Sequence, residues 1–225
     1  NKNKWIACGR RGMILVSIDD GKTWIQRNIN TSYYCWYIAY IDKKWVLLET
    51  GGKVLISDDN GETFKELQTS TDKNLRSIAS NGKRWIAIGD YKTIIGSDDY
   101  GETWYNLNTT EDLFLSDIAC NGMIWCIVGS FGSILTSTNN GVTWSKKSFR
   151  AHNAFNAVTY SDENFVIVGD GILTSKNNAN TFELIYTGQN INEEFNDIVY
   201  TGNNWISVGQ NGTIVVSNQC VNKWR

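Results

Sequence analysis

The sequence contains no proline and a single histidine, His152, among its 225 residues. Zinc sites and hydrolase triads depend on histidine beside cysteine clusters or a nucleophile motif, and this chain offers neither combination. No apolar run approaches the roughly 18 residues that a membrane-spanning helix needs. These absences argue against a zinc enzyme, a triad hydrolase and a protein inserted in a membrane.

The chain also lacks an excess of charge of either sign, because 21 Lys and Arg stand against 23 Asp and Glu. No basic surface is therefore expected, and nucleic acid is not predicted as a partner. No signal peptide is visible, but the chain begins at Asn1 rather than at methionine, so residues upstream are expected to be missing. An extracellular, cell-surface or phage-particle location is favoured, with the cytoplasm as the alternative. The proline-free composition suggests a bacterium or phage with AT-rich genes.

The five cysteines are odd in number and show no CxxC or paired spacing. Three of them, Cys8, Cys35 and Cys126, stand at repeat positions that other copies fill with hydrophobic residues. We therefore expect small buried hydrophobic side chains and no disulfide framework.

Two aromatic ladders with a period of about 40 residues run through the whole chain. The first consists of Trp5, Trp45, Trp85, Trp125, Phe165 and Trp205. The second consists of Trp24, Phe64, Trp104, Trp144, Phe182 and Trp224, of which only Phe182 is out of step. A strict period of this length indicates a structural unit copied about six times.

The third repeat predicts four short antiparallel strands over residues 77–80, 85–88, 93–97 and 103–107. Asn81-Gly82 suits a tight hairpin between the first two strands, and no segment has the period of a helix. Four such strands followed by a linker are typical of a propeller blade. The sequence predicts an all-β fold, a single β-propeller over residues 1–225 with six four-stranded blades. The first and last blades are incomplete, and seven blades are the alternative if flanking residues are missing.

A turn motif with the pattern Ser-x-Asp-x-Gly-x-Thr-Trp follows the third strand of each early repeat. It recurs at residues 17–24, 57–64 and 97–104, and with Asn for Asp at residues 137–144. The motif resembles the Asp-box, or BNR repeat, and its fifth and sixth copies have decayed. Its members are Asp19, Gly21, Trp24, Asp59, Gly61, Phe64, Asp99, Gly101, Trp104, Asn139, Gly141 and Trp144.

These motif residues are predicted to be structural. The carboxylate or amide closes the turn through backbone N–H groups, glycine adopts positive φ, and the aromatic ring packs between sheets. Paired aspartates such as Asp58 and Asp59 suggest calcium, but the turns offer too few converging oxygens for six to eight ligands. No metal and no cofactor are expected.

Positions that differ between the copies are the candidates for ligand binding at the mouth of the central channel. At the start of the first strand the copies carry Trp36, Arg76, Ser116, Asn156 and Asn196, and the next position includes Tyr37, Asp117 and Asp197. The hairpins between strands two and three add Arg10, Arg11, Tyr91, Phe131 and Gln210. Aromatic and arginine side chains beside polar groups are typical of recognition surfaces. Trp36 is the strongest candidate.

The Asp-box resemblance raises the possibility of a sialidase, whose chemistry needs three arginines, a Tyr–Glu pair and an aspartate. The Arg-Ile-Pro-type motif of that family is absent here, since the chain has no proline. A glycosidase using Asp117 and Asp197 as facing carboxylates stays as the alternative function.

The repeat more closely resembles the non-catalytic propellers of the photosystem II stability and assembly factor family. The shared features are the Trp-x-x-x-Gly second strand, the Gly-x-Ile-x-x-Ser third strand and the 40-residue period. The resemblance implies a scaffold that holds a protein partner through an arginine-bearing face, for which only Arg10, Arg11 and Arg76 are available. The sequence thus predicts a binding propeller for a glycan or a protein, of unknown oligomeric state.

Overall fold

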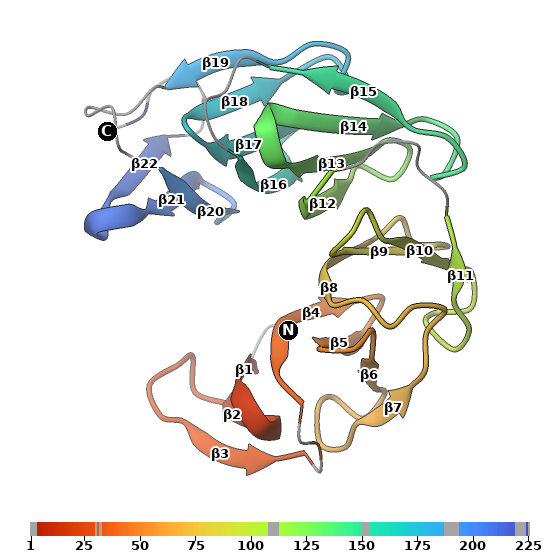
Figure 1. Cartoon of the computed structure of the whole chain (residues 1–225). Coiled ribbons are helices and arrows are strands. Elements are labelled where there is room, and N and C mark those ends of the chain that lie inside the picture. The colour runs from red at the N-terminus through yellow and green to blue at the C-terminus, as the bar shows by residue number, and fades with distance from the viewer. Residues whose placement is uncertain are drawn as a thin grey trace. The chain divides into compact units, whose positions relative to one another are not determined.

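The computed structural model divides the chain into two compact units, Asn1–Leu107 and Asn108–Arg225. The residues that it describes are 4–29, 31, 33–107, 113–149, 154–186, 194–218 and 224. Arg150, His152 and Cys220 lie outside them. Each unit contains three antiparallel sheets, which we call blades 1 to 6 in chain order (Figure 1).

The first unit holds blades 1 to 3. Blade 1 consists of β1 (Trp5–Cys8), β2 (Met13–Ser17) and β3 (Ile25–Asn28), with the 3-10 turn η1 (Arg10–Gly12) after β1. Blade 2 consists of β4 (Cys35–Ile41), β5 (Lys44–Glu49), β6 (Val54–Ser57) and β7 (Lys65–Leu67). Blade 3 consists of β8 (Leu75–Ser80), β9 (Trp85–Gly89), β10 (Ile94–Ser97) and β11 (Tyr105–Asn106).

The second unit holds blades 4 to 6. Blade 4 consists of β12 (Leu115–Cys120), β13 (Trp125–Gly129), β14 (Ser133–Ser137) and β15 (Ser145–Ser148), with η2 (Ser130–Gly132) after β13. Blade 5 consists of β16 (Phe155–Ser161), β17 (Asn164–Gly169), β18 (Ile172–Ser175) and β19 (Glu183–Tyr186). Blade 6 consists of β20 (Phe195–Tyr200), β21 (Asn204–Gly209) and β22 (Ile214–Asn218), with η3 (Gln210–Gly212) after β21.

The prediction of an all-β, six-bladed β-propeller is confirmed. Each strand pairs antiparallel with the next strand of its blade, and within the described ranges blades 1 and 6 have three strands, where the repeats were expected to be incomplete. Among the described residues the only helical elements are three 3-10 turns, and none has the length and hydropathy of a transmembrane helix. A single domain over residues 1–225 stays a prediction.

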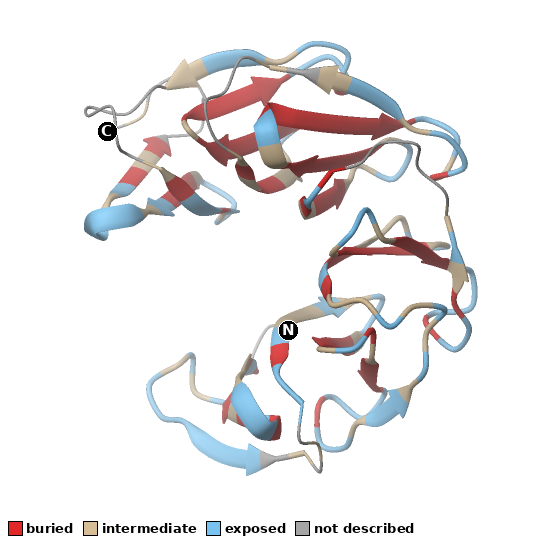
Figure 2. Cartoon of the chain, in the orientation of Figure 1, coloured by how far each residue is buried: buried red, intermediate tan, exposed pale blue. Residues whose placement is uncertain are grey.

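The second and third strands of the blades form the core. In blades 2 and 5, which have a neighbouring blade on each side within their own unit, every residue of β6, β17 and β18 is buried (Figure 2). Their sequences are mostly hydrophobic, with polar residues only toward the strand ends, because a sheet covered on both faces has no solvent side. The outer strands β7 and β19 are mostly exposed.

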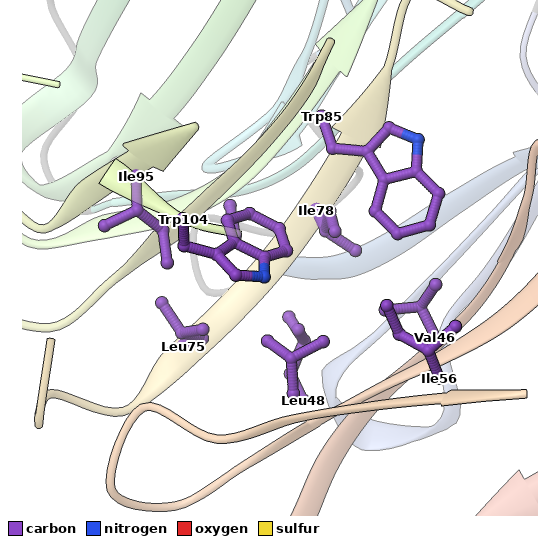
Figure 3. Close-up of a cluster of buried hydrophobic side chains, with 10 residues drawn as sticks. Val46, Leu48, Ile56, Leu75, Ile78, Trp85, Ile95 and Trp104 are labelled. Carbon is purple, nitrogen blue, oxygen red and sulfur yellow. The ribbon is translucent and has the colours of Figure 1, made fainter. Parts of the chain in front are cut away.

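The first aromatic ladder lies between adjacent blades. The ring of Trp85 is fully buried with Val46 and Ile56 of blade 2, in a cluster that also contains Trp104 (Figure 3). Its indole N–H donates to Asp42 Oδ2 at 2.6 Å, so the polar atom of this buried ring is satisfied. Trp45, Phe165 and Trp205 are likewise buried against the blade that precedes them, whereas Trp5, in blade 1, is 56% exposed.

The Asp-box turns share one hydrogen-bond pattern. In blade 1 the carboxylate of Asp19 accepts the Thr23 N–H at 2.9 Å and the Thr23 hydroxyl at 2.6 Å, and Ser17 Oγ accepts the Gly21 N–H at 2.9 Å. Blades 2 and 3 repeat these contacts around Asp59 and Asp99. The box aromatics differ in burial, since Trp104 is buried while Trp24 is 43% exposed.

The other aspartate of each pair in blades 2 and 3, which precedes the motif aspartate, bonds elsewhere. Asp58 pairs with Lys44 at 2.8 Å, and Asp98 pairs with Arg84 at 2.6 Å. The two carboxylates of a pair therefore have separate partners. Within the described ranges, no three His, Cys, Asp or Glu side chains gather in a way that could hold a metal ion.

Acid is expected to weaken the turns that carry aspartate. Hydrogen bonds from Thr23 and Ser17 lower the pKa of Asp19 to about 2, and the matching bonds lower the pKa of Asp59. Since the folded-state pKa lies below the unfolded value of about 3.9, this stabilisation is present above pH 4 and is lost as the pH falls towards 2. Denaturant unfolding at pH 7, 4, 3 and 2 measures the loss.

The chain supplies its own control for this prediction. In blades 4 and 5 Asn139 and Asn177 occupy the aspartate position and accept the same N–H bond at 2.9 Å without titrating. The triple variant Asp19→Asn, Asp59→Asn, Asp99→Asn should fold at pH 7 and lose less stability than the wild type between pH 4 and 2. An unchanged pH profile would contradict the role of these carboxylates.

Candidate binding site

The predicted binding residues all lie at one end of their blades. We call this the upper end: it is where the innermost strand begins and where the second and third strands are joined. The opposite, lower end carries the Asp-box turns. In the first unit the upper ends hold Arg10, Arg11, Trp36, Tyr37, Arg76 and Tyr91. In the second unit they hold Asp117, Phe131, Asn156, Asn196 and Gln210.

A β-bulge occurs near the start of the innermost strand in blades 2 to 6. In blade 2 Cys35 pairs with Glu49 and Tyr37 pairs with the adjacent Leu48, so Trp36 has no partner across the ladder. The bulged residues of the five blades are Trp36, Arg76, Ser116, Asn156 and Asn196. A bulge interrupts the pairing and redirects a side chain, and bulges are common beside functional sites. The positions that vary between the repeats are thus the bulged positions, at which the backbone forms no pair with the neighbouring strand.

An open cleft lies at the upper ends of blades 1 and 2. Its volume is about 360 Å³, and Gly9, Arg10, Tyr34, Cys35 and Trp36 line it. Trp36 is 62% exposed, and its ring centroid lies 6.2 Å from that of Tyr34. The Arg10 guanidinium lies 5.7 Å from the Tyr34 ring centroid, within cation–π range. The cleft combines an aromatic wall with a fixed positive charge.

The remaining predicted residues of the first unit have different surroundings. Arg76 Nε donates to Asp90 Oδ1 at 2.5 Å, and Asn74 donates to the other oxygen of Asp90 at 3.1 Å. This carboxylate orients Arg76, whose side chain stays 55% exposed. Tyr37 is half-buried against the core between blades 2 and 3.

The hairpin tips present side chains from strained backbone. Arg11, Tyr91, Phe131 and Asn211 occupy the same hairpin position with φ between 54° and 56°. This left-handed conformation costs a non-glycine residue about 1–2 kcal/mol. Tyr91 is 69% exposed and Phe131 is 77% exposed. Burial therefore does not explain why these two residues occupy a position at which glycine would be less strained.

In the second unit a hydrogen-bonded group joins blades 5 and 6. Asn156 Nδ2 donates to Glu194 Oε1 at 3.0 Å and to the Phe195 carbonyl at 2.8 Å, while Gln210 Nε2 donates to Glu194 Oε2 at 2.7 Å. Asn156 and Gln210 were predicted from the sequence, and Glu194 was not. Asn196, on the neighbouring bulge, is exposed.

Both carboxylate oxygens of Asp117 bind the backbone. Oδ1 accepts the Ile118 N–H at 2.9 Å, and Oδ2 accepts the Val158 N–H of the next blade at 2.8 Å. Asp197 repeats the first of these bonds with Ile198 at 2.8 Å. These contacts use the carboxylates to tie strands together.

Glu49 is the residue of this region that the sequence analysis did not single out. It ends β5, is fully buried and accepts the Thr31 hydroxyl on Oε2 at 3.0 Å, while Oε1 finds no hydrogen-bond partner among the residues that the structure describes. Burial raises the pKa of this carboxyl. The other five blades carry glycine at this position: Gly9, Gly89, Gly129, Gly169 and Gly209. Comparing the residue four after each ladder aromatic would have found the exception.

No family model matches the chain, and no curated protein matches it. Two solved structures resemble it over essentially its whole length. One, YCF48 bound to D1 peptide, has 15% sequence identity and a TM-score of 0.79, and the match covers 100% of this chain and 77% of that one. The other, YCF48 from Cyanidioschyzon merolae, has 14% identity and a TM-score of 0.74, covering 99% and 80%. At these identities the likeness is one of fold, and it agrees with the family resemblance that the repeat predicted: the chain has the β-propeller fold of the two YCF48 structures.

Proposed function

We propose that this chain is a non-catalytic binding propeller that holds a peptide segment of a protein partner at the upper ends of its blades. The observation that carries the proposal is the open cleft beside Arg10, Tyr34 and Trp36. An exposed tryptophan on a bulge and an arginine fixed over a ring are residues of the kind that dominate binding energy at interfaces.

The comparison with solved structures supports a peptide as the type of ligand. One similar structure is YCF48 bound to a D1 peptide. A peptide fits the cleft because side chains of an extended segment can enter it one at a time while the segment continues over the neighbouring hairpin tips. The residues expected to make contact are Arg10, Arg11, Trp36, Arg76 and Tyr91 in the first unit.

A glycosidase is less well supported by the contacts at the upper ends. Its two proposed carboxylates, Asp117 and Asp197, accept backbone N–H groups. A general acid needs an accessible proton near the scissile bond, whereas backbone N–H groups already occupy both oxygens of Asp117 and one oxygen of Asp197. These aspartates therefore suit a structural role better than acid–base catalysis.

Trp36→Ala is expected to weaken peptide binding by about tenfold to a hundredfold, since truncating a central aromatic anchor commonly costs 1–3 kcal/mol. A random peptide library displayed on phage would be selected on the full-length chain. The selected peptides would then be titrated by fluorescence polarisation against the wild type, Trp36→Ala and Arg76→Ala.

Trp24→Ala is the matched control, because it removes a partly exposed tryptophan from the lower end of blade 1. It should leave the peptide affinity unchanged. If Trp36→Ala and Arg76→Ala both retain wild-type affinity, the upper-end site is wrong. A glycan array probed with the same proteins tests the other predicted ligand class, and glycan binding lost in Trp36→Ala with no peptide selected would replace the peptide proposal.

A further inference from the structure

Two cysteines meet where blades 1 and 2 come together. Cys8 is the last residue of β1 and Cys35 is the first residue of β4. The Cys35 N–H donates to the carbonyl of Gly9, the residue after Cys8, at 3.1 Å. The Cys8 sulfur in turn lies 3.7 Å from the Cys35 carbonyl oxygen. The two backbones are thus in direct contact at the cysteines.

Both side chains belong to the same cluster between these blades. Cys35 is 7% exposed and packs with Ile6 and Trp45, and Cys8 packs against this cluster while staying half-exposed. Cys35 also lines the cleft described above. Cys8 is therefore the more exposed residue of the pair, and Cys35 is the more buried one.

The two thiols have opposite acid–base character. The hydrogen bond between the two thiols lowers the pKa of Cys8. The same interaction, together with burial, raises the pKa of Cys35. The thiolate is the attacking species in exchange reactions, so a lowered pKa favours Cys8 as the thiol that attacks first. Cys8 is also the more exposed of the two, so a dissolved disulfide can reach it first, and the adjacent Cys35 is placed to displace the resulting mixed disulfide.

We propose that Cys8 and Cys35 are a redox-active pair that forms a reversible disulfide by exchange with a low-molecular-weight disulfide such as oxidised glutathione. The Cys8 thiolate attacks one glutathione sulfur, which forms a mixed disulfide and releases one glutathione thiolate. The Cys35 sulfur then attacks Cys8, releases the second glutathione and gives up its proton to it. Two protein thiols are oxidised, and one glutathione disulfide is reduced to two thiols.

This disulfide would connect two blades that otherwise touch only through noncovalent contacts. It would bridge two residues that are 27 positions apart in the sequence and fix the wall of the cleft that Cys35 forms. It is independent of the proposed function, because the reaction needs no bound partner.

Peptide mapping of the full-length chain tests the proposal directly. The protein would be incubated in a glutathione redox buffer, quenched with N-ethylmaleimide and digested with trypsin without reduction. Cleavage after Lys4, Arg10, Arg27 and Lys43 releases Cys8 and Cys35 on separate peptides, residues 5–10 and 28–43. We expect these two peptides linked and lighter by two hydrogens, and separated again after dithiothreitol.

Three single variants serve as controls. Cys8→Ser and Cys35→Ser should each abolish the linked peptide, whereas Cys120→Ser, at a half-exposed cysteine of blade 4, should leave it intact. The proposal is wrong if Cys8 and Cys35 carry only maleimide or separate glutathione adducts. It is also wrong if the linked peptides join other cysteines instead.

A second measurement does not depend on how the variants fold. The melting temperature of the oxidised wild type should exceed that of the reduced wild type, and dithiothreitol should reverse the gain. Equal melting temperatures in a sample whose mapped disulfide is complete would show that the bond does not hold the two blades together, and would contradict the geometry on which the proposal rests.

Discussion

Trp85→Ala is expected to lower the free energy of unfolding by about 3–5 kcal/mol, the range for emptying a buried aromatic site. The Trp85 ring is fully buried between β9 and blade 2, and its indole N–H satisfies Asp42. Removing it leaves a cavity between two sheets that cannot collapse without moving a blade. Urea denaturation followed by circular dichroism measures the loss.

The repeat supplies matched variants for Trp85. Trp5→Ala removes the same side chain from the same repeat position, but 56% of Trp5 is exposed, so the cost should stay below about 1 kcal/mol. Trp85→Phe, which copies the residue found at Phe165, should cost less than Trp85→Ala. Equal losses of unfolding free energy for Trp85→Ala and Trp5→Ala would mean that the first aromatic ladder does not stabilise the contact between blades.

Gly52→Ala is expected to cost about 3 kcal/mol, the sum of backbone strain and steric overlap. Gly52 has a φ of 73°, and a Cβ atom there would lie 2.1 Å from the Thr71 carbonyl oxygen. That oxygen belongs to the linker that crosses the β5–β6 hairpin, where Thr69 Oγ1 also donates to the Gly52 carbonyl at 2.6 Å. A backbone oxygen cannot turn aside as a flexible side chain can, so the linker must move.

A substitution at the adjacent Gly51 separates the cost of backbone strain from the cost of steric overlap. Its φ of 77° is similar, but a Cβ atom there would meet no atom within 4 Å. Gly51→Ala should therefore cost only the strain of the left-handed conformation, about 1 kcal/mol. The same denaturation experiment measures both variants, and equal losses would show that the close approach of the linker contributes nothing.

The fold could be predicted because each repeat carries its own pattern of strands and turns. The ladder aromatics, the Asn-Gly hairpins and the Asp-box motif recur at fixed spacing, and local patterns of this kind describe strands that pair with their neighbours in sequence. The strand boundaries were less accurate. The fourth strand of the third repeat was predicted over residues 103–107 but is β11 (Tyr105–Asn106), because the box turn uses Thr103 to bind Asp99.

The candidate site was only partly accessible to sequence reasoning. Comparing repeats identified Trp36 and Arg76, since positions that vary within a regular scaffold are free to differ. The partner of Arg76 could not be predicted, because Asp90 comes from the following hairpin, whereas Tyr34 lies two residues before Trp36 and could be expected beside it. Glu49 was not among the predicted binding residues, although it stands at a position where the other five blades carry glycine.

The sequence by itself determined the repeat, the blades and the class of fold, because burial along each strand and the chemistry of each turn depend on neighbouring residues in the chain. Only the tertiary structure decided which thiols meet, which carboxylate is buried and where the cleft opens. Cys8, Cys35 and Glu49 come from three strands of two blades. Whether Cys8 and Cys35 come together depends on how blade 1 packs against blade 2. No local sequence pattern predicts the distance between residues of two different blades.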